Sequence, residues 1–530
     1  MKIFSLACLA LFTSNVVWAG IGQTLTVNST FDEPDLIIDG NCNSSTGPEN
    51  RCTLRAAIEE ANNLQGITFI HFNINDSGCV NDICTITVDR ANLGSLPDIV
   101  GIVEIDGSTQ PGNATVCSLP PEQRPDYKIV VQGDSIEFGL RLEAGSDSSI
   151  IRGLNVRNFT DSIAIVNSSD NRIECNLIGT DETGLLGTGL NTANGIIVGC
   201  ESNNNILGGP NAANANVIAD QDIDGIQYFA GFVCPTETSL PSNNAILGNY
   251  IGIAKDGITP LGNIFGGTSF YGGPTFGHYI GTLQDGTTIN GNVIGNSKSG
   301  IYISDGSNNI NIKGNFIGTN RNGVVNFGNV FGGVDILSGS NNIIGGINPG
   351  EANTIAYKDR GVFVTGNDSL NNQIRGNHSI NNIAAIIDIT QNGSSEPDGL
   401  NPNDINDVDT GANNLMNHPD IISAAFVDNL GVISVDVELT VDTSPANAIY
   451  PLQIDVYFDG SEAVNQGSLY TDSGAYTLPQ TITNFTFSLP DGVEGGHIRL
   501  TATDAAGNTS EMSPPFAVGF IDLIFKDGFD

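Results

Sequence analysis

Two repeated phrases constrain the fold of this chain more than any other feature of its sequence. The first begins at Asn176, Asn249 and Asn315 and reads NLIGTDETGLLGTGLN, NYIGIAKDGITPLGN and NFIGTNRNGVVNFGN. The second alternates with it and reads GIIVGCESNNNILGG, GIYISDGSNNINIKGN and GVDILSGSNNIIGG. Alternating apolar residues over such short stretches, separated by Gly, Asn, Ser and Asp, predict short strands joined by turns.

Short strands that recur at a regular interval predict a coil. The phrase GLRL at residue 139 returns as SIAI at residue 162, 23 residues later, so each long repeat of 73 or 66 residues is expected to hold about three coils. Inward Ile, Val and Leu residues then stack on those of the next coil, which is the pattern of a right-handed parallel β-helix. Turn asparagines accept left-handed backbone torsions and, when stacked, hydrogen-bond to the equivalent asparagine one coil away. Such a fold accommodates 530 residues, because it lengthens without enlarging a single core.

The first 19 residues predict export. They contain a basic Lys2, a short apolar run and small residues at Val17 and Ala19, which is the layout of a signal peptide cleaved before Gly20. The mature protein is expected in the medium, on the cell surface or in the periplasm. In such an oxidising compartment, close spacing favours disulfides between Cys42 and Cys52 and between Cys79 and Cys84. Zinc binding by these cysteines is the alternative, and the sequence has no CxxC pair to support it.

The charge balance excludes several classes of partner. The chain has 58 acidic and 19 basic side chains, a formal net charge of −39. Nucleic acids and anionic membrane surfaces are therefore not expected to bind. Free polyuronates would also be repelled unless a divalent cation intervened. No segment after the signal is long and apolar enough to predict a membrane span.

The segment CTLRAAIEEANN predicts a helix that covers the open end of the coil. Thr53 is placed to cap this helix, and Leu54, Ile58 and Ala61 fall on one face. Together with TVNST at 26–30, ITFIHFNI and VEIDGSTQPG, this segment resembles the CSLREA-type N-terminal region of bacterial secreted right-handed parallel β-helix repeat proteins, with CTLRAA in place of CSLREA. The NxIGT phrases are similar to the same group. The resemblance covers roughly residues 20–400 and implies the fold, whereas it implies no particular reaction.

The sequence changes character after Gln391. A hydrophilic stretch with Pro402 and Pro419 precedes longer alternating segments such as ISVDVELTV and LQIDVYFDG, which predict an antiparallel β-sandwich. The phrase TATDAAGNTSE is similar to the last-strand signature of Ig-like modules that follow such β-helices. The expected organisation is a signal peptide (1–19), an N-terminal cap with the first coils (20–130), a parallel β-helix (131–400), an acidic linker (401–419), an Ig-like β-sandwich (420–519) and a C-terminal tail (520–530).

The acidic linker contains the best candidate metal site. Asp404, Asp407, Asp409 and Asn413 surround Gly411 with the spacing D-x-x-D-x-D-x-G-x-N. Ca²⁺ prefers six to eight oxygen ligands, and a glycine-containing loop allows closely spaced carboxylates to converge. The alternative is a solvated linker that binds no ion.

A second acidic group is a weaker candidate for an ion site. Asp220, Asp222 and Asp224 alternate along one strand or turn. We favour the interpretation that they are solvated surface residues.

Alignment of the G-[I/V]-x-[I/V] phrases predicts a column of outward side chains on successive coils. Tyr302, Asp335 and Phe363 in this column could bind a sugar chain by stacking and hydrogen bonding. An ordinary mixed outer face explains these residues as well. The full column consists of Arg141, Ala164, Ile197, Gln227, Tyr302, Asp335 and Phe363.

The stretch from Phe270 to Tyr279 is unusually aromatic and carries little charge, which is typical of a binding loop. Its candidate ligand-binding residues are Phe270, Tyr271, Phe276, His278 and Tyr279. His278 is a conceivable catalytic base, although a single histidine in a loop is more often a polar surface residue. Candidate cations for a carboxylated substrate are Lys298, Lys313, Lys358, Arg360 and Arg375.

These patterns favour a noncatalytic role. The sequence lacks the DD, GHG and RxK pattern of polygalacturonases and the YG-x-DPH pattern of alginate epimerases, so no catalytic residue is assigned. We expect a protein that binds extracellular glycans or cell-envelope material, with Ca²⁺ as the one expected cofactor. The alternatives are a polysaccharide lyase or glycoside hydrolase that acts in the groove of the β-helix, and a structural spacer without a ligand.

Overall fold

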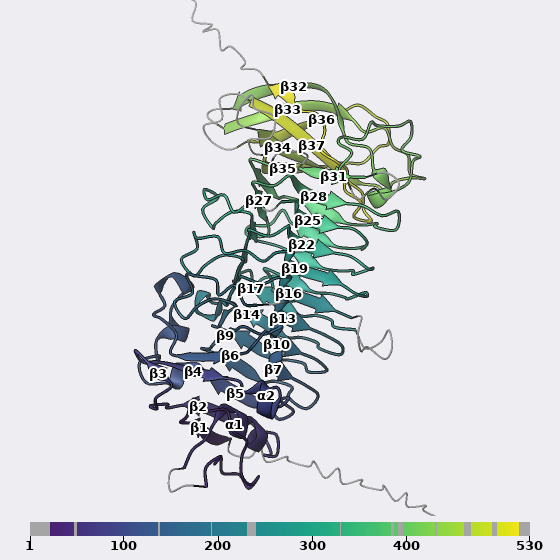
Figure 1. Ribbon diagram of the computed structural model, residues 1–530. Helices are drawn as coiled ribbons and strands as arrows, with labels where there is room; N and C mark the ends of the chain where they lie inside the picture. The colour runs from purple at the N-terminus through teal and green to yellow at the C-terminus, as the bar shows by residue number, and fades with distance from the viewer. Residues whose placement is uncertain are drawn as a thin grey trace, which may run out of the picture.

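The computed structural model shows an elongated rod with a smaller β-domain at its C-terminal end (Figure 1). The expected signal peptide at 1–19 and the expected tail at 520–530 lie outside the described residues. The structure describes residues 22–518 except 47–49, 136–137, 192, 231–239, 329, 383–385, 391–393, 395, 430–431, 460–467 and 490–495.

The rod is a coil of three long sheets, in which neighbouring strands are parallel except for the β3–β4 pair. Sheet A consists of β1 (Gln23–Val27), β2 (Thr68–Phe72), β5 (Val103–Asp106), β8 (Ile150–Arg152), β11 (Arg172–Glu174), β14 (Ile206–Gly208), β17 (Ala245–Leu247), β20 (Tyr279–Ile280), β23 (Asn311–Ile312), β26 (Ile343–Gly345) and β29 (Gln373–Arg375). Sheet B consists of β3 (Cys79–Val80), β4 (Ile83–Thr87), β6 (Ile129–Gln132), β9 (Asn155–Arg157), β12 (Leu177–Ile178), β15 (Val217–Ile218), β18 (Tyr250–Ile251), β21 (Val293–Ile294), β24 (Phe316–Ile317), β27 (Thr354–Ala356) and β30 (His378–Ile380). Sheet C consists of β7 (Phe138–Leu142), β10 (Asp161–Ile165), β13 (Asn194–Val198), β16 (Asp224–Phe229), β19 (Gly266–Tyr271), β22 (Ser299–Ile303), β25 (Gly332–Ile336), β28 (Arg360–Val364) and β31 (Ile387–Ile389).

The interior of the coil is built from stacked columns of apolar side chains. Adjacent strands pair in register, so each inward residue lies beside its equivalent on the next coil, about 4.8 Å away. This arrangement confirms the fold class that the repeats predict. One such column in sheet C, in which every side chain is buried, consists of Leu140, Ile163, Ile196, Ile226, Thr268, Ile301, Val334, Val362 and Ile387.

Buried asparagines form the stacked ladder that the repeats predict. The backbone N–H of each member donates to the side-chain oxygen of the next, at 2.9 to 3.2 Å. Such bonds satisfy turn amides that no strand partner reaches. The ladder consists of Asn176, Asn216, Asn249, Asn292, Asn315, Asn353 and Asn377.

The ladder corrects the expected number of coils in each long repeat. Asn216 lies between Asn176 and Asn249, and Asn292 lies between Asn249 and Asn315, so each repeat holds two coils rather than three. Many of the extra residues form a long turn after every second strand of sheet B, and others lengthen the turn 281–292 between sheets A and B. An antiparallel bridge between Ile253 and Pro260 closes one of these long turns into a hairpin.

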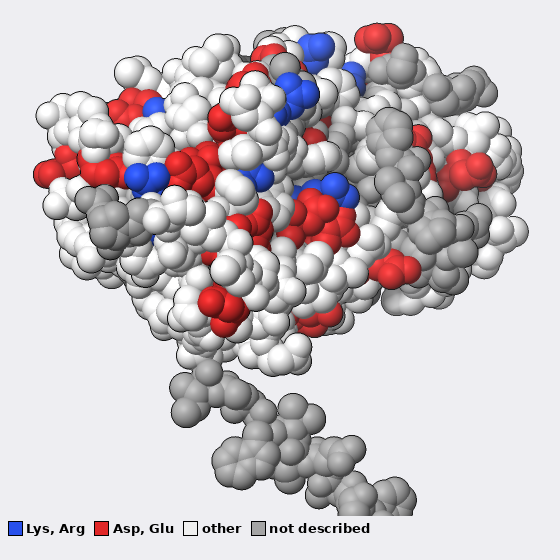
Figure 2. Space-filling model, turned by 60° about the horizontal axis from the view of Figure 1, so that its bottom comes forward, with Lys and Arg blue, Asp and Glu red and all other residues white. Residues whose placement is uncertain are grey.

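The N-terminal end is closed by a short helix and two disulfides. Helix α1 (Leu54–Ala61) begins after Thr53, whose side chain accepts a hydrogen bond from the backbone N–H of Ala56, as expected. A second helical turn, α2 (Arg90–Leu93), lies nearby at the same end of the rod (Figure 1). The predicted disulfides are confirmed: Cys42 is bonded to Cys52 and Cys79 to Cys84. A third disulfide, Cys117–Cys175, was not predicted. Figure 2 views the rod with this end forward and shows more acidic than basic surface.

The C-terminal domain consists of two antiparallel sheets. One contains β32 (Asp420–Asn429), β33 (Val432–Thr440) and β36 (Thr483–Ser488). The other contains β34 (Leu452–Asp459), β35 (Ser468–Tyr476), β37 (Gly496–Thr503) and β38 (Phe516–Val518). Their facing apolar side chains form a separate core that includes Val435, Leu452 and Leu500.

The loop between β37 and β38 closes the open end of the coil. The Asn508 side chain accepts a hydrogen bond from the backbone N–H of Asn371, and the Thr509 hydroxyl accepts one from the N–H of Ile374. Glu511 accepts another from the N–H of Ile389. These residues belong to the phrase TDAAGNTSE. The phrase therefore caps strand edges that would otherwise be unpaired.

Candidate functional site

The predicted outward column lies in register along sheet C. Each member pairs with its equivalent on the neighbouring strand, and the structure adds Ser269 and Asp388 to the predicted set. Ser269 was missed because its strand reads GGTSFY, without the G-[I/V]-x-[I/V] phrase. The complete column is Arg141, Ala164, Ile197, Gln227, Ser269, Tyr302, Asp335, Phe363 and Asp388.

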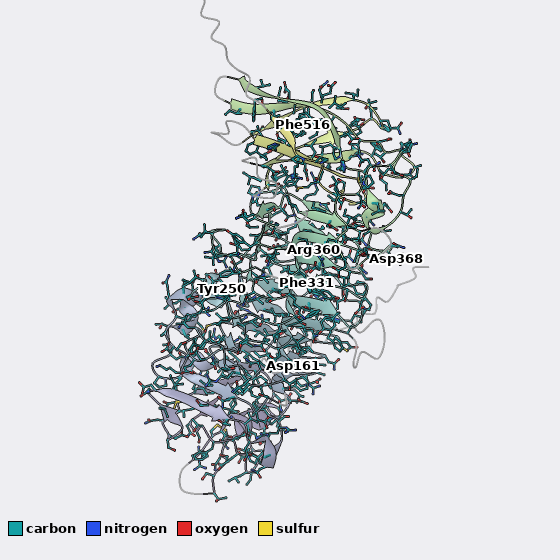
Figure 3. The ribbon with its side chains drawn as sticks, turned by 45° about the horizontal axis from the view of Figure 1, so that its top comes forward. Asp161, Tyr250, Phe331, Arg360, Asp368 and Phe516 are labelled. Atoms are coloured by element: carbon teal, nitrogen blue, oxygen red, sulfur yellow. A yellow bond between two sulfur atoms is a disulfide. The ribbon has the colours of Figure 1, made fainter. Side chains whose placement is uncertain are left out.

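Two of the three sugar-binding candidates in this column are buried, which corrects the expectation that they meet a ligand. Nε of Arg360 donates to Oδ1 of Asp335 at 3.0 Å, and the Arg360 guanidinium lies 3.8 Å from the centre of the Phe363 ring. Arg360 therefore covers both side chains, on the part of sheet C where Figure 3 labels it. Only Tyr302 remains half-buried and faces solvent.

A groove with a volume of about 630 Å³ crosses the outer face of sheet C beside Tyr302. Three aromatic rings lie edge to face along it. The Phe265 and Tyr302 centroids are 5.3 Å apart, those of Phe265 and Tyr271 6.3 Å, and those of Tyr271 and Tyr302 6.5 Å. The groove is lined by Asp222, Ile223, Ile264, Phe265, Tyr271, Lys298, Tyr302, Ser304, Asp305, Leu337 and Ser338.

The groove continues into a second hollow of about 380 Å³, which shares Asp222, Ile264 and Lys298 with the first. Its shape follows from the alternation of long and short turns. The turns 252–265 and 318–331 are long, whereas the turn 295–298 between them is short. Lys298 therefore lies in a recess between two longer turns. We call the two connected hollows the sheet C groove.

The sheet C groove has few charged side chains, and most of them form no ion pair within the described residues. Lys298 is exposed, its Nζ lies 5.9 Å from the centre of the Phe265 ring, and no carboxylate of the described residues forms an ion pair with it. Asp222 and Asp305 are exposed at opposite ends of the strands. Oδ2 of Asp305 accepts a hydrogen bond from the backbone N–H of Gly272 at 2.7 Å.

Behind the aromatic rings lies a buried polar network. The Ser269 hydroxyl donates to Oδ1 of Asp224 at 2.6 Å, and the Asn194 amide donates to Gln227 at 3.0 Å. Burial raises the pKa of Asp224 to about 7, and hydrogen bonds from Ser269 and Tyr271 oppose this rise. Asp224 is fully buried, so it does not itself meet a ligand in the groove.

The two exposed carboxylates of the first hollow, Asp222 and Asp305, do not form a hydrolytic pair. Glycosidases need two carboxyl groups about 5 to 9.5 Å apart. Asp222 precedes strand β16 and Asp305 follows strand β22, so they are separated by roughly 20 Å along the strand direction. The two exposed carboxylates that line the groove at its ends are therefore too far apart to act on one bond.

The aromatic stretch from Phe270 to Tyr279 connects strand β19 to strand β20, but two of its predicted ligand-binding rings are not on the surface, which corrects the prediction for them. Phe270 and His278 are fully buried and pack against the ring of Tyr228, at 4.8 and 4.4 Å between centroids. Phe276 is exposed and Tyr279 is half-buried, and Tyr279 lies in sheet A. Of this group only Tyr271 lines the sheet C groove.

His278 occupies a position of a second asparagine ladder. The backbone N–H of Asn205 donates to the side chain of Asn244, and the N–H of Asn244 in turn donates to Nδ1 of His278 at 3.3 Å. Burial lowers the pKa of His278 to about 3. The ring is thus a neutral structural acceptor inside the coil, and the proposed role as a base is corrected.

Most of the predicted cationic side chains form ion pairs or are buried outside the groove. Lys313 pairs with Glu351, Arg360 with Asp335 and Arg375 with Asp455. Lys358 is fully buried, and burial lowers its pKa well below the ordinary value. Lys298 is the member of this set that lines the groove.

The acidic linker brings three of its four predicted ligands together. Carboxylate oxygens of Asp404, Asp407 and Asp409 lie within 4.8 Å of one another. Oδ1 of Asp404 and Oδ1 of Asp409 are buried and accept no hydrogen bond from the part of the chain that the structure describes. Burial, together with the neighbouring carboxylates, raises the pKa of Asp407 to about 7 and that of Asp409 to about 6. Such a site favours a cation.

The fourth predicted ligand, Asn413, lies elsewhere. Its Oδ1 accepts a hydrogen bond from the backbone N–H of Asn372 at 2.9 Å, and its Nδ2 donates to the carbonyl of Asn372. The N–H of Asn342 donates to Asn372 in the same way, so Asn413 ends a stack of asparagines and is corrected as a metal ligand. Asp220, Asp222 and Asp224 do not converge either, because Asp224 is buried in sheet C and Asp222 is exposed.

Comparison with known proteins adds little to this description. No family model matches the chain, and no curated protein matches it. Among solved structures, the chain is similar to the enzymatically active domain of tailspike protein 2 of bacteriophage CBA120, with 12% identity over 85% of this chain and 68% of that chain and a TM-score of 0.22. The fold itself defines the class, a parallel β-helix protein. None of the described helices is long and apolar enough to span a membrane.

Proposed function

We propose that this protein is an exported module that binds a glycan of the extracellular space or cell envelope in the sheet C groove. The observation that carries this proposal is the set of three aromatic rings, Phe265, Tyr271 and Tyr302, beside the uncommitted Lys298. Aromatic faces and edges contact the apolar C–H surfaces of sugar rings, and hydroxyl groups at their tips donate and accept hydrogen bonds. Grooves of this volume are typical of ligand sites.

The remaining groups in the groove suit recognition without turnover. Asp222 and Asp305 can accept hydrogen bonds from sugar hydroxyls, and Lys298 can donate to a ring oxygen or an acidic substituent. The wide separation of Asp222 and Asp305 argues against a hydrolase that uses these two carboxylates. A lyase requires a base beside a neutralised carboxylate, and His278 is not accessible for that role.

Export and modular organisation are part of the same proposal. The disulfides Cys42–Cys52, Cys79–Cys84 and Cys117–Cys175 suit an oxidising compartment, as does the predicted signal peptide. We assign the N-terminal region to the CSLREA type and the C-terminal domain to the Ig-like type on the basis of their sequence phrases. In this arrangement the coil presents the groove, and the two ends close the coil.

We also propose that Asp404, Asp407 and Asp409 bind Ca²⁺. Hard carboxylate oxygens are its preferred ligands, and two of the converging oxygens have no described donor. Asp407 also accepts a hydrogen bond from Thr443 at 3.0 Å, so the ion would lie where the linker meets the β-sandwich. Its role would be structural.

A panel of insoluble and soluble polysaccharides tests the proposed function. The mature protein should be retained on at least one glycan, and the supernatant should contain no new reducing ends or unsaturated uronates. Release of either product would establish the lyase or hydrolase instead. If the protein is neither retained nor active on any glycan, the spacer hypothesis replaces the proposal.

A further inference from the structure

A third hollow lies on a different face of the rod, where the coil meets the β-sandwich. Its volume is about 360 Å³. Phe316, Thr354 and His378 form its floor, because they are paired outward residues on successive strands of sheet B. The turn around Arg321 forms one wall, and Ser468 and Leu469 of strand β35 form another. We call this hollow the junction pocket.

The junction pocket contains a cation that is held in place without a carboxylate. The Arg321 guanidinium lies 5.7 Å from the centre of the Phe316 ring and 5.9 Å from that of Tyr250. Tyr250 is labelled in Figure 3, on a different flank of the rod from Arg360. Glu122 is hydrogen-bonded to the Tyr250 hydroxyl, and within the described ranges no carboxylate forms an ion pair with Arg321. The guanidinium thus lies beside two aromatic rings and reaches the Tyr250 hydroxyl, and its other donors are accessible.

This arrangement contrasts with other arginines of the coil. Arg360 and Arg375 are both largely buried, and each is paired with an aspartate. In a chain with a net charge of −39, carboxylates are abundant, yet Arg321 forms no ion pair with any carboxylate of the described residues. Its side chain is exposed, so its charge is accessible to an external partner. A planar guanidinium binds a planar carboxylate through two parallel hydrogen bonds.

The other side chains that line the junction pocket indicate what kind of molecule carries the ligand carboxylate. Phe316 and Leu469 offer apolar surface, and the Leu469 side chain is 41% exposed. Burial lowers the pKa of His378, so its ring is neutral at physiological pH, and its buried Nδ1 has no hydrogen-bond partner among the described residues. The Ser468 hydroxyl is already bonded to Asp459. The other polar side chains of the lining are Asn322, Thr354 and Ser379.

We propose that the junction pocket binds a small carboxylate that carries an apolar or aromatic body, with Arg321 holding the carboxylate and Phe316 and Leu469 contacting the body. This site is separate from the sheet C groove and does not depend on the function proposed for that groove.

Titration with three probes tests this proposal by calorimetry or ligand-observed NMR. The full-length mature protein should bind 3-phenylpropanoate with a Kd of about 1 mM or tighter. It should bind 3-phenylpropan-1-ol, which lacks the charge, and galacturonate, which lacks the apolar body, at least tenfold more weakly. Equal binding of either of these probes would overturn the assigned chemistry.

Variants locate the binding. Arg321→Gln should weaken binding of 3-phenylpropanoate at least tenfold, and Arg321→Lys should weaken it less, because the charge remains and the fork is lost. Leu469→Ser, an exposed substitution on the opposite wall, should also weaken binding. Lys298→Gln in the sheet C groove is the matched control and should leave the Kd unchanged. No saturable binding by the unmodified protein, or an unchanged Kd in Arg321→Gln, would refute the proposal.

Discussion

Arg375 in the last strand of sheet A and Asp455 in the β-sandwich form a buried ion pair, with Nε of Arg375 donating to Oδ2 of Asp455 at 2.8 Å. Beside it, the backbone N–H of Gly376 donates to the hydroxyl of Tyr457 at 3.1 Å. The Asp455 side chain is fully buried. The pair therefore joins the two domains inside their contact surface, where water does not compensate a lost partner.

Arg375→Ala should destabilise the protein by about 3–5 kcal/mol, because it leaves the Asp455 carboxylate buried without its cation. Urea denaturation followed by circular dichroism measures this free energy of unfolding. The matched control is Arg90→Ala, which removes an exposed pair with Asp134 at 3.9 Å and should cost at most about 1 kcal/mol. Equal effects of the two substitutions would show that the domain contact does not depend on the pair.

The asparagine ladder should contribute to stability at each of its positions. Asn249 accepts a hydrogen bond from the N–H of Asn216 and donates to the carbonyl of Leu207 and to Asn292. Asn249→Ala leaves these buried groups without partners and should cost about 2–4 kcal/mol. Asn322→Ala, at an exposed turn, should change the free energy of unfolding by less than about 0.5 kcal/mol. A tolerated Asn249→Ala would contradict the ladder.

Asp224 should make stability depend on pH. Its pKa is about 7 in the folded protein and 3.8 as an ordinary aspartate, so the folded state binds the extra proton between these values. The stabilising contribution is complete below about pH 3.8 and is lost as the pH rises through about 7. Asp224→Asn keeps an acceptor for Ser269 and cannot titrate. Melting curves at several pH values should therefore fall less steeply from pH 4 to 7 in the variant, whereas parallel profiles would contradict the buried acid.

Calcium should stabilise the linker and the sandwich. If the affinity is that of an extracellular calcium module, 100 times the Kd of Ca²⁺ adds about 2.7 kcal/mol to the free energy of unfolding. Asp407→Asn combined with Asp409→Asn should abolish the response of the melting temperature to Ca²⁺ and to EGTA. Asp220→Asn combined with Asp222→Asn is the control and should preserve it. If Ca²⁺ does not change the melting temperature of the unmodified protein, the acidic segment is a solvated linker that binds no ion.

The periodic part of the structure could be predicted from the sequence because neighbouring coils have equivalent environments. The alignment that placed Tyr302 beside Asp335 gives the observed register, and close spacing gave the disulfides Cys42–Cys52 and Cys79–Cys84. The asparagine ladder followed from one recurring turn residue. These predictions need only the repeat and the contact of each coil with the next.

The site itself depends on departures from the repeat. Alignment of the repeated phrases does not show these departures. Whether an outward residue meets solvent depends on side chains from other coils, as Arg360 over Phe363 shows. The sheet C groove exists because a short turn at Lys298 lies between two long turns, and the predicted three coils per repeat obscured this alternation. His278 entered the interior because it replaces a ladder asparagine.

The central claim is that Tyr271 and Tyr302 bind the glycan, and the affinity of a double variant for the retained polysaccharide tests it most directly. Tyr271→Ala combined with Tyr302→Ala should weaken binding by at least about 30-fold, equivalent to about 2 kcal/mol, as expected for aromatic residues at the centre of a binding site. Phe276→Ala combined with Tyr279→Ala, which removes two aromatic rings outside the groove, should bind like the unmodified protein. Unchanged affinity in the first variant, with both variants folded, would contradict the account.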